Sequence, residues 1–113
     1  MPLGVDLIEI QRAKLFYKNH RKNLKSILNQ EETEYLESGN RHERLAVLLA
    51  SKEAVFKAID GSRSGINTFQ DIQIFPNNKF SFAVRKRISQ KITGLKLSVL
   101  KNKRFVIVRC EPT

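Results

Sequence analysis

Residues 45–59 have the sequence LAVLLASKEAVFKAI, and this stretch decides the fold. On a helix its large apolar side chains share one face. Four alanines at a spacing of four residues form a second stripe on nearly the opposite side. The two sets are Leu45, Leu48, Leu49, Val55, Phe56 and Ile59, and Ala46, Ala50, Ala54 and Ala58. Because a helix that is apolar on most sides is usually buried, we predict a central helix over residues 45–59 with the rest of the chain packed around it.

Three charged residues interrupt this apolar stretch. Lys52 lies inside the apolar arc, where a charge is costly unless it is paired or binds an ion. Glu53 and Lys57 are four residues apart, in the order that favours a salt bridge along a helix. Two interpretations therefore stand at this point, a helix salt bridge or a functional site built on the central helix.

The length and the charge of the chain narrow the possible functions. With 113 residues, one domain over residues 1–113 is expected. We expect no membrane span and no signal peptide, and the single cysteine allows no internal disulfide, so a cytoplasmic protein is predicted. A formal net charge of +10 indicates a negatively charged partner, which includes nucleic acid, an anionic membrane, a phosphorylated small molecule or an acidic protein.

The first predicted strand, residues 3–10, carries a carboxylate on its apolar face. In an alternating pattern Val5 and Leu7 point one way, whereas Asp6 points the other way with Ile8 and Ile10. An aspartate there is either a structural group, such as a helix cap or a satisfied core residue, or part of a site.

The remaining elements predict an α+β fold. We expect a helix over residues 11–28 that is interrupted near residues 19–20, a short helix over 31–36 and a loop over 60–65. Strands are predicted over 69–75 and 80–84, a short basic helix over 85–92, and a hairpin formed by 95–99 and 105–110. This order is typical of an antiparallel sheet packed on a long central helix.

Three segments resemble a known family. Residues 4–12, GVDLIEIQR, resemble the opening motif G-[IV]-D-[IL]-x-E-[IL]-x-R of holo-[acyl-carrier-protein] synthases, the small phosphopantetheinyl transferases. Residues 45–58 resemble their second motif, L-A-x-R-[FW]-A-[AS]-K-E-A-x-x-K-A, and residues 69–74, FQDIQI, resemble F-x-D-I-E-[IV]. Order and spacing are similar over nearly the whole chain, so the resemblance implies the 4′-phosphopantetheinyl transferase fold.

The resemblance also implies an activity and its catalytic residues. The family transfers the 4′-phosphopantetheine arm of coenzyme A to a serine of an acidic acyl carrier protein and releases adenosine 3′,5′-bisphosphate. Asp6 and Glu53 match the two carboxylates that hold Mg²⁺ in the family. Such a pair suits Mg²⁺, which completes its octahedron with water and phosphate oxygens. Lys57 matches the family lysine that reaches the pyrophosphate.

Further residues are implied in binding. The resemblance assigns coenzyme A binding to Lys57, Gly61, Gly65, Ser98 and Lys101, and carrier-protein docking to Arg12, Arg21 and Lys22. It also implies a homotrimer, which agrees with the apolar character of both faces of residues 105–108. A polyphosphate substrate and an acidic protein would account for the positive charge, so we expect neither a nucleic acid nor a membrane as partner.

This chain departs from the family at the coenzyme A end of the predicted site. Leu48 replaces an arginine, Asp60 lies in the turn that is usually rich in glycine, and Lys101 replaces a histidine and so cannot exchange a proton near neutral pH. Three hypotheses follow: a divergent active transferase, which we favour, a non-catalytic relative that binds acidic carrier proteins, and a small nucleic-acid-binding domain. The last is suggested only by the charge and by phenylalanines on the predicted strands.

Overall fold

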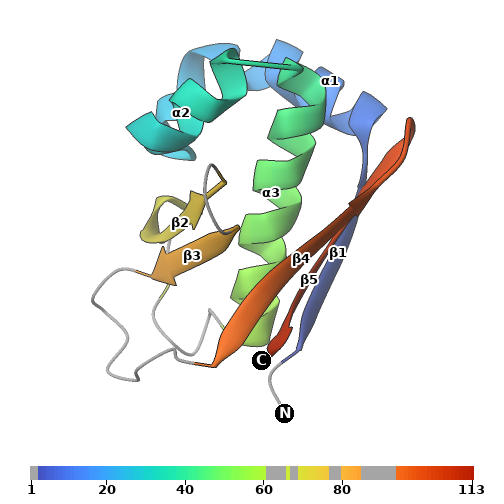
Figure 1. Ribbon diagram of the computed structural model, residues 1–113. Coiled ribbons are helices and arrows are strands. Elements are labelled where there is room, and N and C mark those ends of the chain that lie inside the picture. Colours follow the sequence, from blue (N-terminus) through green and yellow to red (C-terminus); the bar gives the residue numbers. More distant parts are fainter. Residues whose placement is uncertain (1–2, 61–65, 67–68, 77–79, 85–93) are drawn as a thin grey trace.

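The long helix α3 (Arg41–Ala58) is the centre of the structure, with strands on two of its sides and shorter helices over its N-terminal half (Figure 1). The computed structural model describes residues 3–60, 66, 69–76, 80–84 and 94–113. In chain order the other elements are β1 (Gly4–Glu9), α1 (Ile10–His20), the 3₁₀ helix η1 (Arg21–Ser26), α2 (Gln30–Glu37), the 3₁₀ helix η2 (Phe69–Asp71), β2 (Ile72–Phe75), β3 (Ser81–Val84), β4 (Leu95–Lys101) and β5 (Phe105–Pro112). The predicted α+β class is confirmed.

The predicted central helix is confirmed, and it begins four residues earlier than residue 45. Asn40 caps its start, since the side-chain oxygen accepts a hydrogen bond from the backbone N–H of Glu43 at 3.2 Å. The helix ends before Asp60, whose φ of 52° takes the chain out of the helical conformation. The apolar sequence is explained by burial, because ten side chains of α3 are buried: Leu45, Ala46, Val47, Leu48, Ala50, Ser51, Lys52, Ala54, Val55 and Ala58.

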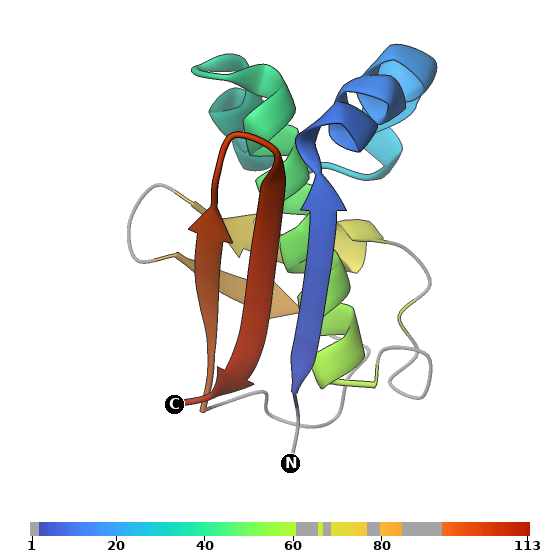
Figure 2. The ribbon, with the colours of Figure 1, turned by 90° about the vertical axis from the view of Figure 1, so that its right-hand side faces the viewer.

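An antiparallel sheet with strand order β1-β5-β4 packs against α3 (Figure 2). Its inner face carries Val106, Val108 and Cys110, which are fully buried, and Asp6 lies opposite Val108 in the register of β1 and β5. The prediction that Asp6 faces inward is therefore confirmed. The outer face carries large apolar side chains that are exposed in the single chain.

β1 approaches α3 so closely that only glycine fits at its first position. A Cβ atom on Gly4 would lie 2.8 Å from the backbone nitrogen of Ala58 and 2.9 Å from the carbonyl carbon of Ala54. Because real Cβ atoms essentially never approach other atoms this closely, any larger residue would push the strand away from the helix. The glycine thus sets the distance between the strand of Asp6 and the helix of Glu53.

A second, two-stranded sheet, β2-β3, lies on another side of α3 (Figure 1). Ile72 and Ile74 of β2 are fully buried in the core. The predicted strand over residues 69–75 is correct only from Ile72 onward, because residues 69–71 form η2. The predicted antiparallel sheet on the long helix is confirmed, and the described strands form this second sheet besides. The predicted helix over residues 85–92 lies outside the described residues.

The predicted interruption near residues 19–20 is confirmed, because α1 ends at His20 and the chain continues as η1. The two helices α1 and α3 are joined by ring contacts. Tyr17 packs edge-on against His42 with ring centroids 6.0 Å apart, and the guanidinium of Arg41 lies 5.0 Å from the centre of the Tyr17 ring. Within the described residues, no helix has the length and apolar character that crossing a membrane requires.

Candidate active site

Asp6 and Glu53 line the same cavity, which has a volume of about 530 Å³. β1 supplies Asp6 and α3 supplies Glu53, so two elements far apart in sequence bring their carboxylates to one opening. Arg12, on the first turns of α1, lines the same cavity. The Asp6 side chain is 22% exposed, which leaves the carboxylate accessible although it points to the inner face of the sheet.

Lys57 binds Asp6 rather than Glu53. Its Nζ atom lies 3.2 Å from Oδ1 of Asp6 and also donates a hydrogen bond to the carbonyl oxygen of Val5 at 3.1 Å. The close approach of β1 to α3 at Gly4 accounts for this choice of partner. Glu53 makes no hydrogen bond or ion pair with the described residues, so the salt bridge along the helix that the spacing suggested is not formed.

The donor set fits a hard cation that keeps part of its shell open. No group of three or more His, Cys, Asp and Glu side chains that could hold a metal exists among the described residues. Among the described residues that line the cavity, the carboxylates are Asp6 and Glu53. Mg²⁺ does fit, because it is commonly bound by one or two carboxylates and completes its shell with water and phosphate oxygens.

One wall of the cavity is formed by α1, of which only Arg12 was predicted as a site residue. Arg12, Leu15, Phe16, Asn19 and His20 all line the cavity. Their positions i, i+3, i+4, i+7 and i+8 lie on one face of a helix, so extending that face from Arg12 would have found them. The aromatic rings of Phe16 and His20 stack with centroids 4.4 Å apart.

Leu49 of α3 and Phe69 of η2 also line the cavity. The Phe69 ring packs edge-on against Phe56, one turn beyond Glu53 on α3, with ring centroids 6.2 Å apart. Nothing in the spacing of Phe69 indicated this role, because the residue was expected to begin a strand.

The other predicted site residues do not line this cavity in the single chain. Arg21 and Lys22 are exposed on η1, just beyond the end of α1. Ser98 lies on the outer face of the sheet, paired in register with Arg109. Lys101 binds Glu43, with Nζ 2.6 Å from Oε1. Gly61 and Gly65 lie outside the described residues, and Leu48, which replaces the family arginine, is fully buried in the core.

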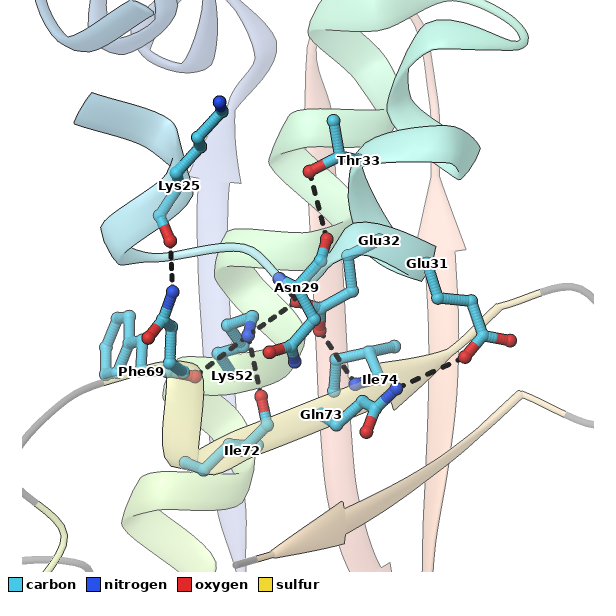
Figure 3. Close-up of polar contacts among 11 residues, drawn as sticks. Lys25, Asn29, Glu31, Glu32, Thr33, Lys52, Phe69, Ile72, Gln73 and Ile74 are labelled. Carbon is cyan, nitrogen blue, oxygen red and sulfur yellow. Dashed lines mark hydrogen bonds and ion pairs between the residues drawn. The ribbon is translucent and has the colours of Figure 1, made fainter. Parts of the chain in front are cut away.

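The buried charge that the sequence singled out, Lys52, is paired with Glu32 (Figure 3). Both side chains are fully buried, and Nζ lies 2.9 Å from Oε1 of Glu32. Burial lowers the pKa of Lys52, whereas the neighbouring carboxylate raises it. The expectation that a charge at this position must be paired is therefore confirmed. The partner was not foreseen, although Glu32 follows Asn29 at capping-box spacing.

Comparison with known proteins places this chain in a family. The sequence model of the 4′-phosphopantetheinyl transferase superfamily matches residues 2–110, and the chain belongs to that superfamily. It is 38% identical over 73 residues to a holo-[acyl-carrier-protein] synthase of Clostridium kluyveri, an alignment that covers 64% of this chain. That alignment spans only about half of the relative, 54% of its length.

Solved structures of the same family share the fold. The structure of holo-[acyl-carrier-protein] synthase from Helicobacter pylori in complex with coenzyme A superimposes with a TM-score of 0.75, at 22% identity, covering 98% of this chain and 99% of that chain. The synthase from Bacillus anthracis in complex with CoA (3′,5′-ADP) gives a TM-score of 0.70 at 25% identity, covering 96% and 92%.

Proposed function

We propose that residues 1–113 act as one transferase domain that moves the 4′-phosphopantetheine arm of coenzyme A to a serine of an apo acyl carrier protein. The observation that carries the proposal is the shared cavity of Asp6 and Glu53, with the cation of Lys57 beside Asp6, in a chain of this superfamily. The coenzyme A complexes of structural neighbours support the choice of substrate.

The reaction breaks one bond of a pyrophosphate and makes one phosphate ester. The serine oxygen of the carrier protein bonds to the phosphorus that bears the pantetheine arm, the bond from this phosphorus to the bridging oxygen breaks, and adenosine 3′,5′-bisphosphate leaves. The serine proton passes to solvent through water or a cavity carboxylate. Because the nucleophile belongs to the partner, the transferase itself needs no activated serine or cysteine.

Asp6 and Glu53 would hold Mg²⁺, for which their two carboxylates are a suitable partial donor set. When bound, Mg²⁺ neutralises charge on the bridging and leaving oxygens of the pyrophosphate. Lys57 is 46% exposed and has a flexible stem, so its ammonium can leave Asp6 and contact the incoming phosphates. In this proposal the residues of the chain bind and orient the phosphates through their charges, and they form no covalent intermediate.

Arg12 would steer the carrier protein to the cavity. It lines the opening beside the carboxylates, and Arg21 and Lys22 continue the positive charge on η1. An acidic partner would be attracted by a chain of net charge +10, and its docking would place the serine near Asp6 and Glu53.

We propose further that three copies of the chain assemble and complete the site. Val5, Leu7 and Leu100 expose 44%, 54% and 73% of their surface on the outer face of the sheet, and such a patch commonly marks an interface. Ser98 and Lys101 do not line the cavity of their own chain, so in this proposal they contact coenzyme A bound to a neighbouring copy. Sedimentation that finds only a 13.0 kDa monomer at micromolar concentration would refute the trimer.

The test of activity is incubation with coenzyme A, Mg²⁺ and an apo carrier protein, followed by intact mass measurement. The expected result is a carrier heavier by one phosphopantetheine group and stoichiometric release of adenosine 3′,5′-bisphosphate. Glu53→Gln should abolish transfer and keep the fold, whereas Lys103→Gln, which alters an exposed lysine of the β4–β5 turn, should act like the parent. Carrier binding without any mass change would instead favour the non-catalytic binding module.

A further inference from the structure

The buried ion pair of Lys52 and Glu32 takes no part in the proposed chemistry, yet it has a complete set of hydrogen bonds (Figure 3). An ammonium group has three N–H donors. Besides the carboxylate of Glu32, Nζ of Lys52 reaches the carbonyl oxygen of Phe69 at 2.8 Å and that of Ile72 at 2.6 Å. Three acceptors thus match three donors.

Both carboxylate oxygens of Glu32 also accept hydrogen bonds from the backbone. Its Oε1 atom accepts from the backbone N–H of Asn29 at 2.8 Å, and its Oε2 atom accepts from the backbone N–H of Ile74 at 2.8 Å. The two side chains therefore fix the backbone at the start of α2, in η2 and along β2, and they attach all three to α3.

Stability alone does not account for such a pair. Replacing a buried ion pair by uncharged groups is often neutral or stabilising, because the removal of two charges from water is costly. The sheet β2-β3 has only two strands and, in the described residues, shares no ladder with the three-stranded sheet. A sheet of two strands is marginal by itself, so its place against α3 depends on contacts such as these.

The ion pair reaches the candidate active site through Phe69. Phe69 and Glu53 line the same cavity, and Lys52 precedes Glu53 directly on α3. We infer that the Lys52–Glu32 pair is a positioning device that holds Phe69 as a wall of the cavity at a fixed place relative to Glu53. Lys52 is fully buried and bonds to the backbone of Phe69, so it acts through that residue and not on the reacting atoms.

The position of Phe69 can be measured without any assay of activity. The chain contains no tryptophan and two tyrosines, so Phe69→Trp introduces a single tryptophan at this wall that can be excited selectively. In that background, E32Q/K52M removes both charges, keeps similar side-chain shapes and deletes the donors to the carbonyl groups of Phe69 and Ile72. We expect a folded protein in which acrylamide quenches the tryptophan at least about twofold more strongly, because the wall is no longer held.

The matched control removes an ion pair of the same kind from the surface. Arg41 and Glu37 are paired at 3.1 Å with side chains 45% and 48% exposed, and neither lines the cavity. E37Q breaks this pair and keeps the contact of the Arg41 guanidinium with the ring of Tyr17, so it should leave both the quenching and the rate of transfer as in the parent.

The effect of the Lys52–Glu32 pair on the transfer reaction rests on the proposed function, and it is measured separately as a change in kcat. E32Q/K52M should lower kcat about ten- to a hundredfold, since small misplacements at a site have effects of this size. In a Phe69→Ala background the same change should have almost no further effect, because both act through one residue. If the pair only stabilised the fold, E32Q/K52M would lower kcat by the same factor in the parent and in the Phe69→Ala background.

Quenching equal to that of the parent, independent losses in kcat, or an E32Q/K52M chain that does not fold would each overturn the inference. The last outcome would make the pair a requirement of folding and not of position. If the parent itself transfers no phosphopantetheine, the proposed function fails, and the quenching comparison still decides whether the pair positions Phe69.

Discussion

Gly4→Ala tests the geometry on which the candidate site depends. The added methyl group would lie 2.8 Å from the nitrogen of Ala58 and closer still to the carbonyl oxygen of Ala54, and both are backbone atoms of α3. Since a helix backbone cannot rotate away as a side chain can, β1 must move outward. Overpacking of this kind costs about 1–3 kcal/mol.

Two measurable losses follow from that displacement. For a chain of 113 residues, 1 kcal/mol lowers the unfolding midpoint by about 4 °C, so Gly4→Ala should lower it by about 4–12 °C. Asp6 is two residues along the displaced strand, and Glu53 precedes Ala54 on the helix, so the distance between the carboxylates also changes. Transfer activity should fall on the order of a hundredfold even at temperatures where the protein is folded.

Gly39→Ala is the control for this experiment. A Cβ atom there would meet the guanidinium of Arg44, 2.7 Å from Nη2. This end of a side chain can shift where a helix backbone cannot, although the shift disturbs its hydrogen bonds to the carbonyl oxygen of Tyr35 and to Oγ of Ser38. The free energy of unfolding of Gly39→Ala should change by about 1 kcal/mol or less, and its activity should be normal. Equal losses in Gly4→Ala and Gly39→Ala, or parent-like behaviour of Gly4→Ala in thermal unfolding and in transfer, would show that the packing of β1 on α3 is not what places Asp6.

Other properties can be checked in the same protein. Arg12→Glu should raise KM for the carrier protein far more than KM for coenzyme A, and higher ionic strength should act in the same direction, because both weaken attraction to an acidic partner. Lys57→Ala should lower transfer strongly while the stability measured by urea unfolding changes by less than about 1 kcal/mol, since an ion pair with this exposure contributes little. Burial raises the pKa of Cys110 to about 11, so the thiol should stay unreactive toward a disulfide reagent at pH 8 and react fully in urea. Rapid labelling of Cys110 in the folded protein, or equal rises in both KM values for Arg12→Glu, would contradict these expectations.

The central helix and the inward direction of Asp6 could be predicted because each follows from a local period. The alanine and leucine stripes of residues 45–59 require burial on most sides, and alternation along residues 3–10 places Asp6 with Ile8. The cavity that Asp6 and Glu53 share does not follow from a local period. It depends on a glycine that fits against α3, and the sequence shows that glycine without showing what it faces.

The contacts that could not be predicted from the sequence join residues that are far apart along the chain. Lys52 had to be paired, but its partner, Glu32, lies on another helix and its other acceptors are backbone oxygens that no residue type reveals. For the same reason Phe69 was expected in a strand and not as a wall of a cavity. The preference of Lys57 for Asp6 over Glu53 likewise follows from the packing of β1 on α3 and not from the helical spacing.

The register of β1 and β5 has a consequence for how the chain folds during synthesis. Gly4 pairs with Cys110 and Glu9 with Phe105, so the first strand gains its hydrogen-bonded neighbour only after nearly all of these residues have left the ribosome. Contacts between such distant residues slow folding, and an unpaired apolar strand is prone to aggregate while it waits. Asp6 is the first of the candidate site residues to be synthesised. Its carboxylate nevertheless takes its final position late, when β1 pairs with β5.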